Sequence, residues 1–191
     1  FECGYVSSKI KGKLKGKVVW PIYDTEKKSL LGFCGRSLEK ESKMRYLCFG
    51  EKSNFVYPSH LNNKIIEQTK CVLVTEGIPD CMKLFDIGIR NILVLFGTEL
   101  SYGILNYLLR KNVQKVIIST NNEINSANKG AGNRASIKIK SRLLRYFDSK
   151  SVIEHLPPKK DIMDCDNQEL DLWKRQLILL VGESHIGHEN C

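Results

Sequence analysis

Four runs rich in apolar residues, each followed by a segment with helical periodicity, constrain the fold of this chain most strongly. The runs cover residues 71–75, 91–96, 116–120 and 151–156. The helical segments are expected at residues 80–87, 102–109, 130–147 and 169–181. Apolar strands that alternate with helices are typical of a parallel sheet covered on both faces. We therefore expect an α/β fold whose ligands bind beyond the carboxyl ends of the strands.

The residues before position 70 differ in composition and pattern from the rest of the chain. Residues 9–17 read KIKGKLKGK, a basic segment interrupted by glycines. Two short apolar runs at 18–23 and 30–34 enclose a polar turn, which predicts a hairpin. We expect a small basic α+β subdomain over residues 1–69, the parallel-sheet domain over 70–165 and a helical tail over 166–191.

Charge indicates the class of partner. The 30 Lys and Arg against 21 Asp and Glu give a formal net charge of +9. A basic excess favours a polyanion, with nucleic acid as the leading candidate. No stretch approaches the roughly 18 uninterrupted apolar residues of a membrane span, so no membrane partner is expected.

Cysteine usage indicates the compartment. The seven cysteines are scattered, odd in number and contain no C-x-x-C pair, which favours reduced thiols and a cytoplasmic protein. In the tail, His185, His188 and Cys191 lie three residues apart, but three ligands without a fourth do not predict a zinc site. The chain lacks both an initiator Met and a signal-peptide pattern, and we expect it to be a piece of something longer.

Acidic side chains follow the first strand of the expected sheet. Glu76 and Gly77 end the run at 71–75, and Asp80 opens the next helix. Such a carboxylate pair can bind a hard divalent cation through oxygen ligands. Taken alone, the pair is as well explained by a solvated loop glutamate and an aspartate that caps the helix.

Two later strands end in the same way. Asn121 and Glu123 follow the run at 116–120, and Asp161 and Asp164 follow the fourth run. If the first and third strands are neighbours, Glu76 and Glu123 converge on one crevice. Polar strand ends that recur at one edge favour a metal site over unrelated loop carboxylates.

These motifs resemble a known family. The sequence V-T-E-G-x-x-D at 74–80, Gly97-Thr98 after an apolar strand and the polar triplet 121–123 look like the Toprim domain. In the front half, KVVWPI at 17–22 resembles the R-(I/V)-x-F-P-I strand of DnaG-type bacterial and phage DNA primases. GFCGR at 32–36 and RYL at 45–47 resemble their G-F-x-G-R and K-Y-L. The resemblance covers residues 10–165 and implies the primase catalytic core with its Rossmann-like Toprim sheet. The richness in Asn and Lys suggests a phage-like member.

The resemblance assigns roles to residues. Glu76 matches the catalytic, metal-associated Toprim glutamate. The full metal set implied for Mg²⁺ or Mn²⁺ is Glu76, Asp80, Asn121, Glu123, Asp161 and Asp164. The residues implied for nucleic-acid or nucleotide binding are Lys17, Arg36, Arg45 and Lys160. The triplet Asn121-Asn122-Glu123 departs from the D-x-D of the family and has one charge less, which should weaken cation binding.

The activity implied is synthesis of short RNA primers on a single-stranded DNA template. Ribonucleoside triphosphates are the substrates, and a replicative helicase is the implied partner. Two alternatives stay open. A Toprim nuclease would share the carboxylates but would not need the KVVWPI and GFCGR motifs. A non-catalytic nucleic-acid-binding module is favoured by Asn121. Trp20, Tyr46, Phe49 and Tyr57 are either base-stacking or core aromatics.

Overall fold

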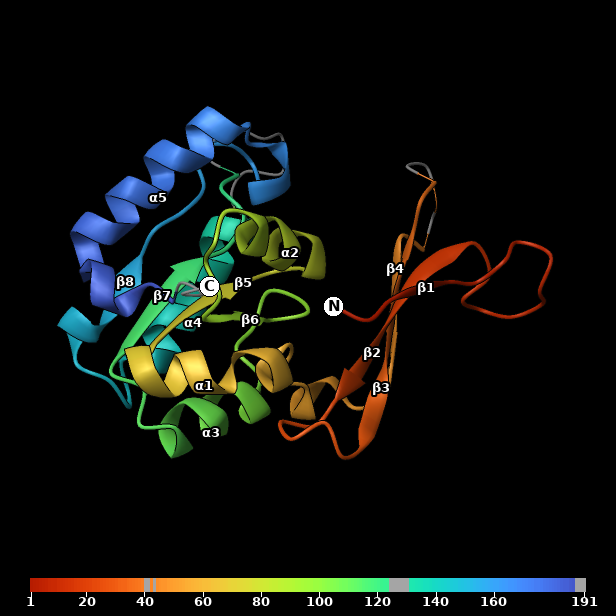
Figure 1. Ribbon diagram of the computed structural model, residues 1–191, viewed down its shortest axis with the longest axis horizontal. Helices are drawn as coiled ribbons and strands as arrows, with labels where there is room; N and C mark the ends of the chain where they lie inside the picture. The colour runs from red at the N-terminus through yellow and green to blue at the C-terminus, as the bar shows by residue number, and fades with distance from the viewer. Residues whose placement is uncertain (40–41, 43, 124–130, 188–191) are drawn as a thin grey trace.

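The strands of this protein form two four-stranded sheets, one antiparallel and one parallel. The computed structural model describes residues 1–39, 42, 44–123 and 131–187. Within these residues the strand orders are β1-β2-β3-β4 and β6-β5-β7-β8. The antiparallel sheet stands beside the helix-covered parallel sheet (Figure 1).

The antiparallel sheet contains the expected hairpin of β2 and β3, with one further strand at each side of it. Its strands are β1 (Gly4–Tyr5), β2 (Lys17–Tyr23), β3 (Leu30–Ser37) and β4 (Tyr46–Phe49). Strand β4 pairs with β3 in a region where no strand was predicted from the sequence. The expectation that all cysteines are thiols is wrong, because Cys34 and Cys48 face each other across β3 and β4 and form a disulfide.

Reduction of this disulfide is expected to destabilise the antiparallel sheet. The bond closes a loop between residues 14 apart in sequence, and cross-links of that span restrict the unfolded chain by about 3 kcal/mol. We expect dithiothreitol, or the Cys34→Ser/Cys48→Ser double variant, to lower the free energy of urea unfolding by about 2 to 3 kcal/mol. Unfolding curves that coincide with and without reductant would contradict this expectation.

The parallel sheet confirms the predicted fold class. Its strands are β5 (Cys71–Thr75), β6 (Ile92–Val94), β7 (Lys115–Ser119) and β8 (Val152–Glu154). Every residue of β5 is buried, as its apolar sequence predicts. Strand β5 pairs with β7, so the first and third predicted strands are neighbours. The polar residues that follow these two strands therefore leave the sheet at the same edge.

Helices cover both faces of the parallel sheet. They are α1 (Ser59–Thr69), α2 (Ile78–Asp86), α3 (Tyr102–Arg110), α4 (Ala131–Leu143) and α5 (Asn167–Val181). Short 3-10 turns are η1 (Lys52–Asn54), η2 (Ser149–Ser151), η3 (Ile162–Asp164) and η4 (Glu183–His185). Helices α2 and α5 pack on the face of β5 that carries Leu73, whereas α1, α3 and α4 pack on the face that carries Val74. Among the described helices, none has the length and apolar character that a bilayer crossing needs.

Several element boundaries differ from the prediction. Helix α2 begins at Ile78, two residues early, because Pro79 suits the first turn of a helix. Helix α4 ends at Leu143, not at Phe147, and its expected start at Gly130 lies outside the described residues. Helix α1 was not predicted, and its Ile66 packs into the core of the parallel sheet. The expected tail also packs on the parallel sheet, because Trp173 of α5 is 2% exposed and belongs to the buried cluster that contains Leu73.

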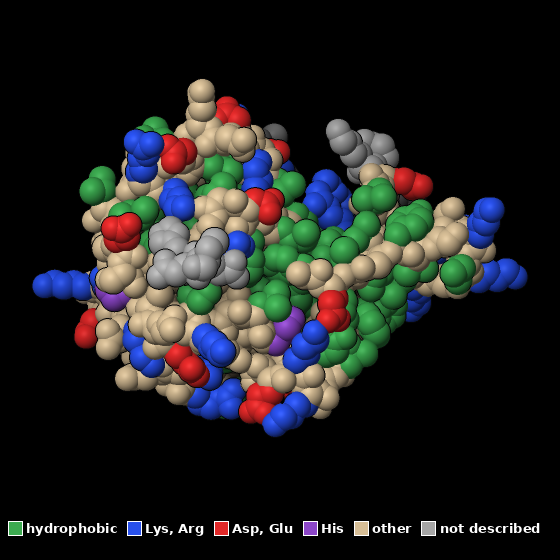
Figure 2. Space-filling view, in the orientation of Figure 1, with side chains coloured by type: hydrophobic (Ala, Val, Ile, Leu, Met, Phe, Trp, Pro, Cys, Tyr) green, Lys and Arg blue, Asp and Glu red, His purple; other side chains and the backbone are tan. Residues whose placement is uncertain are grey.

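The two sheets share one apolar core where they meet. Trp20 and Ile22 of β2 belong to the same buried cluster as Tyr57, Ile78 and Leu73. The space-filling view shows hydrophobic side chains over this junction, with Lys and Arg side chains at the outer end of the antiparallel sheet (Figure 2). The packed junction fixes the antiparallel sheet opposite the carboxyl edge of the parallel sheet.

Candidate active site between the two sheets

One cavity of about 530 Å³ opens where the antiparallel sheet faces the carboxyl edge of the parallel sheet. It is lined by nine of the ten residues that the sequence selected: Arg36, Arg45, Glu76, Asp80, Asn121, Glu123, Lys160, Asp161 and Asp164. The remaining residue, Lys17, does not line it. Carboxylates from three strand ends therefore form one wall, and arginines from the antiparallel sheet form the other.

Glu76 is the first residue after β5 and is held by the neighbouring strand end. Its Oε1 accepts a hydrogen bond of 3.1 Å from the backbone N–H of Asn121. Burial raises the pKa of Glu76 above its ordinary value, the Asn121 bond lowers it, and the nearby charges of Glu123 and Asp161 raise it further. The structure thus places Glu76 in a partly desolvated, electronegative position.

Asp80 lies one helical turn further on and is 8% exposed. Burial, followed by the charges of Asp161 and Glu76, raises its pKa to about 7. Gly77 is extended, with φ of −129°, so it is not needed there for its backbone freedom. A Cβ at Gly77 would instead lie 3.3 Å from Oδ2 of Asp80 and crowd that carboxylate. The glycine of E-G-x-x-D therefore leaves room for the aspartate.

The segment after β7 contributes through its backbone as well as its side chains. Asn121 was expected to offer a side-chain oxygen, and the structure adds its N–H bond to Glu76. The N–H of Glu123 donates to Oδ1 of Asn133, at the start of α4, over 2.9 Å. Asn122 bonds to the next loop, its N–H to the carbonyl of Lys160 at 2.7 Å and its Nδ2 to the carbonyl of Pro157 at 3.0 Å. The loops after β7 and β8 are thereby joined.

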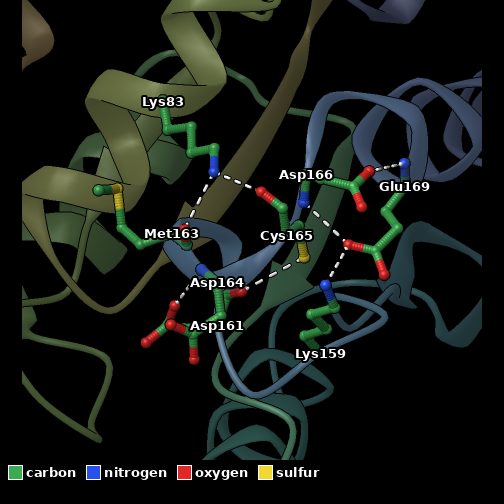
Figure 3. Close-up of polar contacts among 8 residues, drawn as sticks. All are labelled: Lys83, Lys159, Asp161, Met163, Asp164, Cys165, Asp166 and Glu169. Atoms are coloured by element: carbon green, nitrogen blue, oxygen red, sulfur yellow. Dashed lines mark hydrogen bonds and ion pairs between the residues drawn. The ribbon is translucent and has the colours of Figure 1, made fainter.

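The loop after β8 carries the last acidic pair. Asp161 caps the η3 turn, and its Oδ1 accepts the N–H of Asp164 at 2.9 Å (Figure 3). An aspartate that caps a turn bonds to the backbone N–H three residues later. Asp161 and Asp164 therefore lie three residues apart within one capped turn.

The basic wall consists of Arg36 and Arg45, whereas Lys160 lies beside Asp161 at the edge of the acidic wall. The guanidinium of Arg36 lies over the ring of Tyr46, 5.5 Å from its centroid. The expectation for Lys17 needs correction. Its side chain is 5% exposed, and its Nζ donates to the carbonyl of Met44 at 2.6 Å. A buried ammonium bound to backbone cannot contact nucleic acid from this position, and its visible task is to hold the segment that precedes β4.

The acidic residues line one cavity without forming a compact ligand cluster. Within the described parts of the chain, no three His, Cys, Asp or Glu side chains meet in an arrangement that would hold a metal ion. The donors around the cavity are carboxylate and amide oxygens, which suit Mg²⁺ and Mn²⁺. Burial raises the pKa of Glu76 and Asp80, and neighbouring carboxylates raise it further; a cation would offset that second, repulsive contribution. The residues therefore fit a divalent cation in chemistry.

Other predicted features stand apart from the cavity. Nδ1 of His185 lies 2.8 Å from the carbonyl of Thr69, a packing contact at the end of α1. His188 and Cys191 lie outside the described residues. Tyr57 and Trp20 are 2% and 6% exposed and belong to one buried cluster, so both are core aromatics, and Trp20 also reaches the cavity lining.

Sequence reasoning missed three residues that shape the cavity. Phe96 lines it with a left-handed backbone, φ of 57°, and its N–H donates to the carbonyl of Glu76. Asn133 holds Glu123, and Lys83 of α2 bonds to the loop after β8. Only the Gly after Phe96 hinted at an unusual turn, because the other two contacts join segments far apart in sequence.

Comparisons with known proteins agree with this architecture, although no protein-family model matches the chain. A DNA primase of Helicobacter pylori is 30% identical over 128 residues, which cover 64% of this chain and 22% of the relative. The chain thus spans about a fifth of the length of such curated relatives.

Solved structures show the same fold. The zinc-binding and RNA polymerase domains of the Aquifex aeolicus primase superpose with a TM-score of 0.67 and 24% identity, covering 90% of this chain and 41% of that one. A DnaG primase catalytic domain bound to ssDNA superposes with a TM-score of 0.64 and 21% identity, covering 84% of this chain and 53% of that one. By sequence and by fold, the chain is therefore similar to a part of the catalytic core of DnaG-type DNA primases.

Proposed function

We propose that this chain is the nucleotide-joining part of a DNA primase, which makes short RNA primers on single-stranded DNA by metal-dependent nucleotidyl transfer. The observation that supports this best is the single cavity with a carboxylate wall from the parallel sheet and an arginine wall from the antiparallel sheet. The relatives are named DNA primases, and one of the similar structures holds single-stranded DNA.

The proposed reaction joins a 3′-hydroxyl to the α-phosphorus of a ribonucleoside triphosphate, with pyrophosphate leaving. Glu76, Asp80, Glu123, Asp161 and Asp164 would hold Mg²⁺ or Mn²⁺, with Asn121 as a neutral member. Bound cations of this kind offset the negative charge that develops on the attacking and leaving oxygens. Without a cation, this wall would repel the phosphates, so the carboxylates alone cannot serve the reaction.

The opposite wall has a separate task. Arg36 and Arg45 would bind backbone or nucleotide phosphates, and Lys160 would bind at the edge of the acidic wall. Tyr46, which lines the cavity and is 54% exposed, would contact a base. Phosphate contacts of this kind set the register of the template without reading its sequence.

Single-stranded DNA binding is expected to depend on Arg36 and Arg45 but not directly on Lys17. Each lost phosphate contact should weaken binding and reduce the slope of log K against log salt by about 0.7. We expect Arg36→Ala and Arg45→Ala to show this change in fluorescence anisotropy titrations between 50 and 200 mM salt, conditions over which such slopes are measured. Lys17→Met, whose ammonium is buried, should keep the wild-type slope. A reduced slope for Lys17→Met with wild-type slopes for both arginine variants would contradict this assignment.

Incorporation of labelled ribonucleotides on single-stranded DNA tests the proposed function. With Mg²⁺ or Mn²⁺ we expect short RNA products that require both template and divalent cation and that disappear with EDTA. Shortening of end-labelled DNA without ribonucleotide incorporation would identify a nuclease instead. DNA binding with neither reaction would identify a binding module.

Further parts of the proposal follow from the primase function. A replicative helicase is the proposed partner. The proposed location is the cytoplasm, which for a phage protein is the cytoplasm of its host. A phage origin stays a prediction from composition. The division into residues 1–69, 70–165 and 166–191 is proposed with one qualification, that α1 and α5 both pack on the parallel sheet.

A further inference from the structure

The loop that carries Asp161 and Asp164 is fastened to α2 by one lysine. Nζ of Lys83 donates to the carbonyl oxygens of Met163, at 3.0 Å, and Cys165, at 2.5 Å (Figure 3). These two carbonyls flank Asp164 and lie 80 and 82 residues from Lys83 in sequence. The bonds therefore join the helix that carries Asp80 to the turn that carries the last acidic pair.

Helix α2 meets the backbone of Met163 through two residues. The Met163 carbonyl accepts a hydrogen bond from Lys83, and the Met163 N–H lowers the pKa of Asp80, which burial raises. Asp80 and Lys83 are three residues apart on one helix, so they face the same side. A single helical turn thus sets the position of η3 relative to the cavity.

Charge explains why such a fastening is needed. Asp161 and Asp164 line the same cavity as Glu76 and Asp80, so carboxylates of like charge face one another there and repel. The ammonium of Lys83 binds to carbonyl oxygens, so it holds the loop without using any carboxylate as its partner. The carboxylates of Asp161 and Asp164 stay available to the cavity that they line.

The two ends of the loop are held by other residues. Asn122 binds the carbonyls of Pro157 and Lys160 before the turn. Lys159, also before the turn, pairs with Glu169 after it, and the side chain of Glu169 completes the cap of α5 with Asp166 (Figure 3). Lys83 holds the turn itself, which lies between these two ends.

We propose that Lys83 is a positioning residue that holds the η3 turn, and with it Asp161 and Asp164, against α2. Its consequence for cation binding rests on the function proposed above, whereas its effect on the turn does not. Because Lys83 touches backbone and no reacting group, its loss should change the placement of the acidic pair and leave the remaining wall intact.

Amide hydrogen exchange measures the turn directly. The N–H groups of Asp164 and Cys165 are bonded within the turn, to Asp161 and to the carbonyl of Ile162. We expect Lys83→Met to speed exchange in peptides covering residues 161–166 at least tenfold, roughly the effect of one lost charged hydrogen bond. Lys83→Arg, which keeps two donors, should restore slow exchange. A Lys83→Met protein whose turn exchanges at the wild-type rate would overturn the proposal.

Lys174 provides a matched control. Its Nζ donates to the carbonyl of Ile87 at 2.6 Å, at the far end of α2 from the cavity. Lys174→Met therefore removes the same kind of bond and should leave exchange at residues 161–166 unchanged. If Lys83→Met does not fold, the same comparison is made with Lys83→Gln, whose shorter side chain cannot reach both carbonyls. Equal acceleration in the Lys174 variant would show a general loosening of α2 and would also overturn the proposal.

Mn²⁺ binding measures the consequence for the cavity. We expect Lys83→Met to raise the Kd for Mn²⁺ roughly tenfold, as loss of groups that orient ligands does, while Lys174→Met leaves it unchanged. An unchanged Kd in Lys83→Met beside tight wild-type binding would overturn the role toward the cation. A wild-type chain that binds no Mn²⁺ would count against the proposed function, and hydrogen exchange would still decide the role of Lys83 in the turn.

Discussion

Glu76→Gln is expected to incorporate ribonucleotides about 10³-fold more slowly than the wild-type chain, a change of about 4 kcal/mol in activation free energy. Glutamine has the same shape and can still accept the Asn121 N–H bond that holds Glu76 in place. The substitution therefore removes one negative charge at the centre of the acidic wall and little else. A site that depends on that charge to hold a cation should lose most of its activity.

Glu67→Gln serves as the control for this variant. Glu67 lies on α1, away from the cavity, and pairs with Lys111 at the surface. It should retain wild-type incorporation, and both variants should bind single-stranded DNA as the wild type does. If Glu76→Gln keeps a tenth or more of the wild-type rate, Glu76 is not a catalytic residue.

Asp80→Asn is expected to stabilise the protein at pH 8 in the presence of EDTA. The pKa of Asp80 is raised to about 7 in the folded chain, chiefly by burial, above its ordinary value of 3.8. The folded state therefore binds the proton more tightly than the unfolded state, and stability falls as pH rises from about 4 to about 7. Asparagine carries no charge, so the variant should be more stable by about 3 to 4 kcal/mol at pH 8 and by almost nothing at pH 4.

Urea unfolding at both pH values measures this difference. Asp86→Asn on the exposed end of α2 is the matched control and should show no such pH dependence. An Asp80→Asn protein that is less stable than the wild type at pH 8 would show that the carboxylate is favourably solvated or paired. Adding Mn²⁺ should remove most of the gain, because a cation stabilises the ionised Asp80 and not the asparagine.

The parallel sheet and the acidic edge were predictable because local sequence determines them. Buried parallel strands are apolar along most of their length, so the apolar runs of β5 and β7 can be recognised as strands from the sequence. The residue that follows a parallel strand lies at the carboxyl edge in any such fold, which placed Glu76 and Asn121 without knowledge of their contacts. The same reasoning placed Glu123 and the Asp161–Asp164 pair at this edge of the sheet.

Helix α1 was missed because its inward face is polar. Its buried residues are Ser59, Asn62, Ile66 and Thr69, which have helical spacing but only one apolar member. Nδ2 of Asn62 binds the carbonyl of Ile92, so a hydrogen bond replaces apolar packing on this face. A search for hydrophobic periodicity cannot detect such a helix.

The other misses concern contacts between distant segments. Lys17 was assigned to a nucleic-acid surface by the family resemblance, but β3 and the segment before β4 cover it. Lys83 falls on an amphipathic helix, where a lysine usually faces solvent, and only the folded loop after β8 gives it partners. The cysteine pair became visible only when β3 and β4 aligned in register.

Binding of Mn²⁺ to the acidic wall tests the central claim most directly, since the proposed reaction requires a cation there. Electron paramagnetic resonance of free Mn²⁺ measures it in the wild type, Glu76→Gln, Asp80→Asn and the Glu67→Gln control. We expect the wild type and the control to bind Mn²⁺ equally, and the two cavity variants to bind it at least tenfold more weakly, about 1.4 kcal/mol. Identical titrations in all four proteins would show that the wall does not hold the cation and would contradict the proposed site.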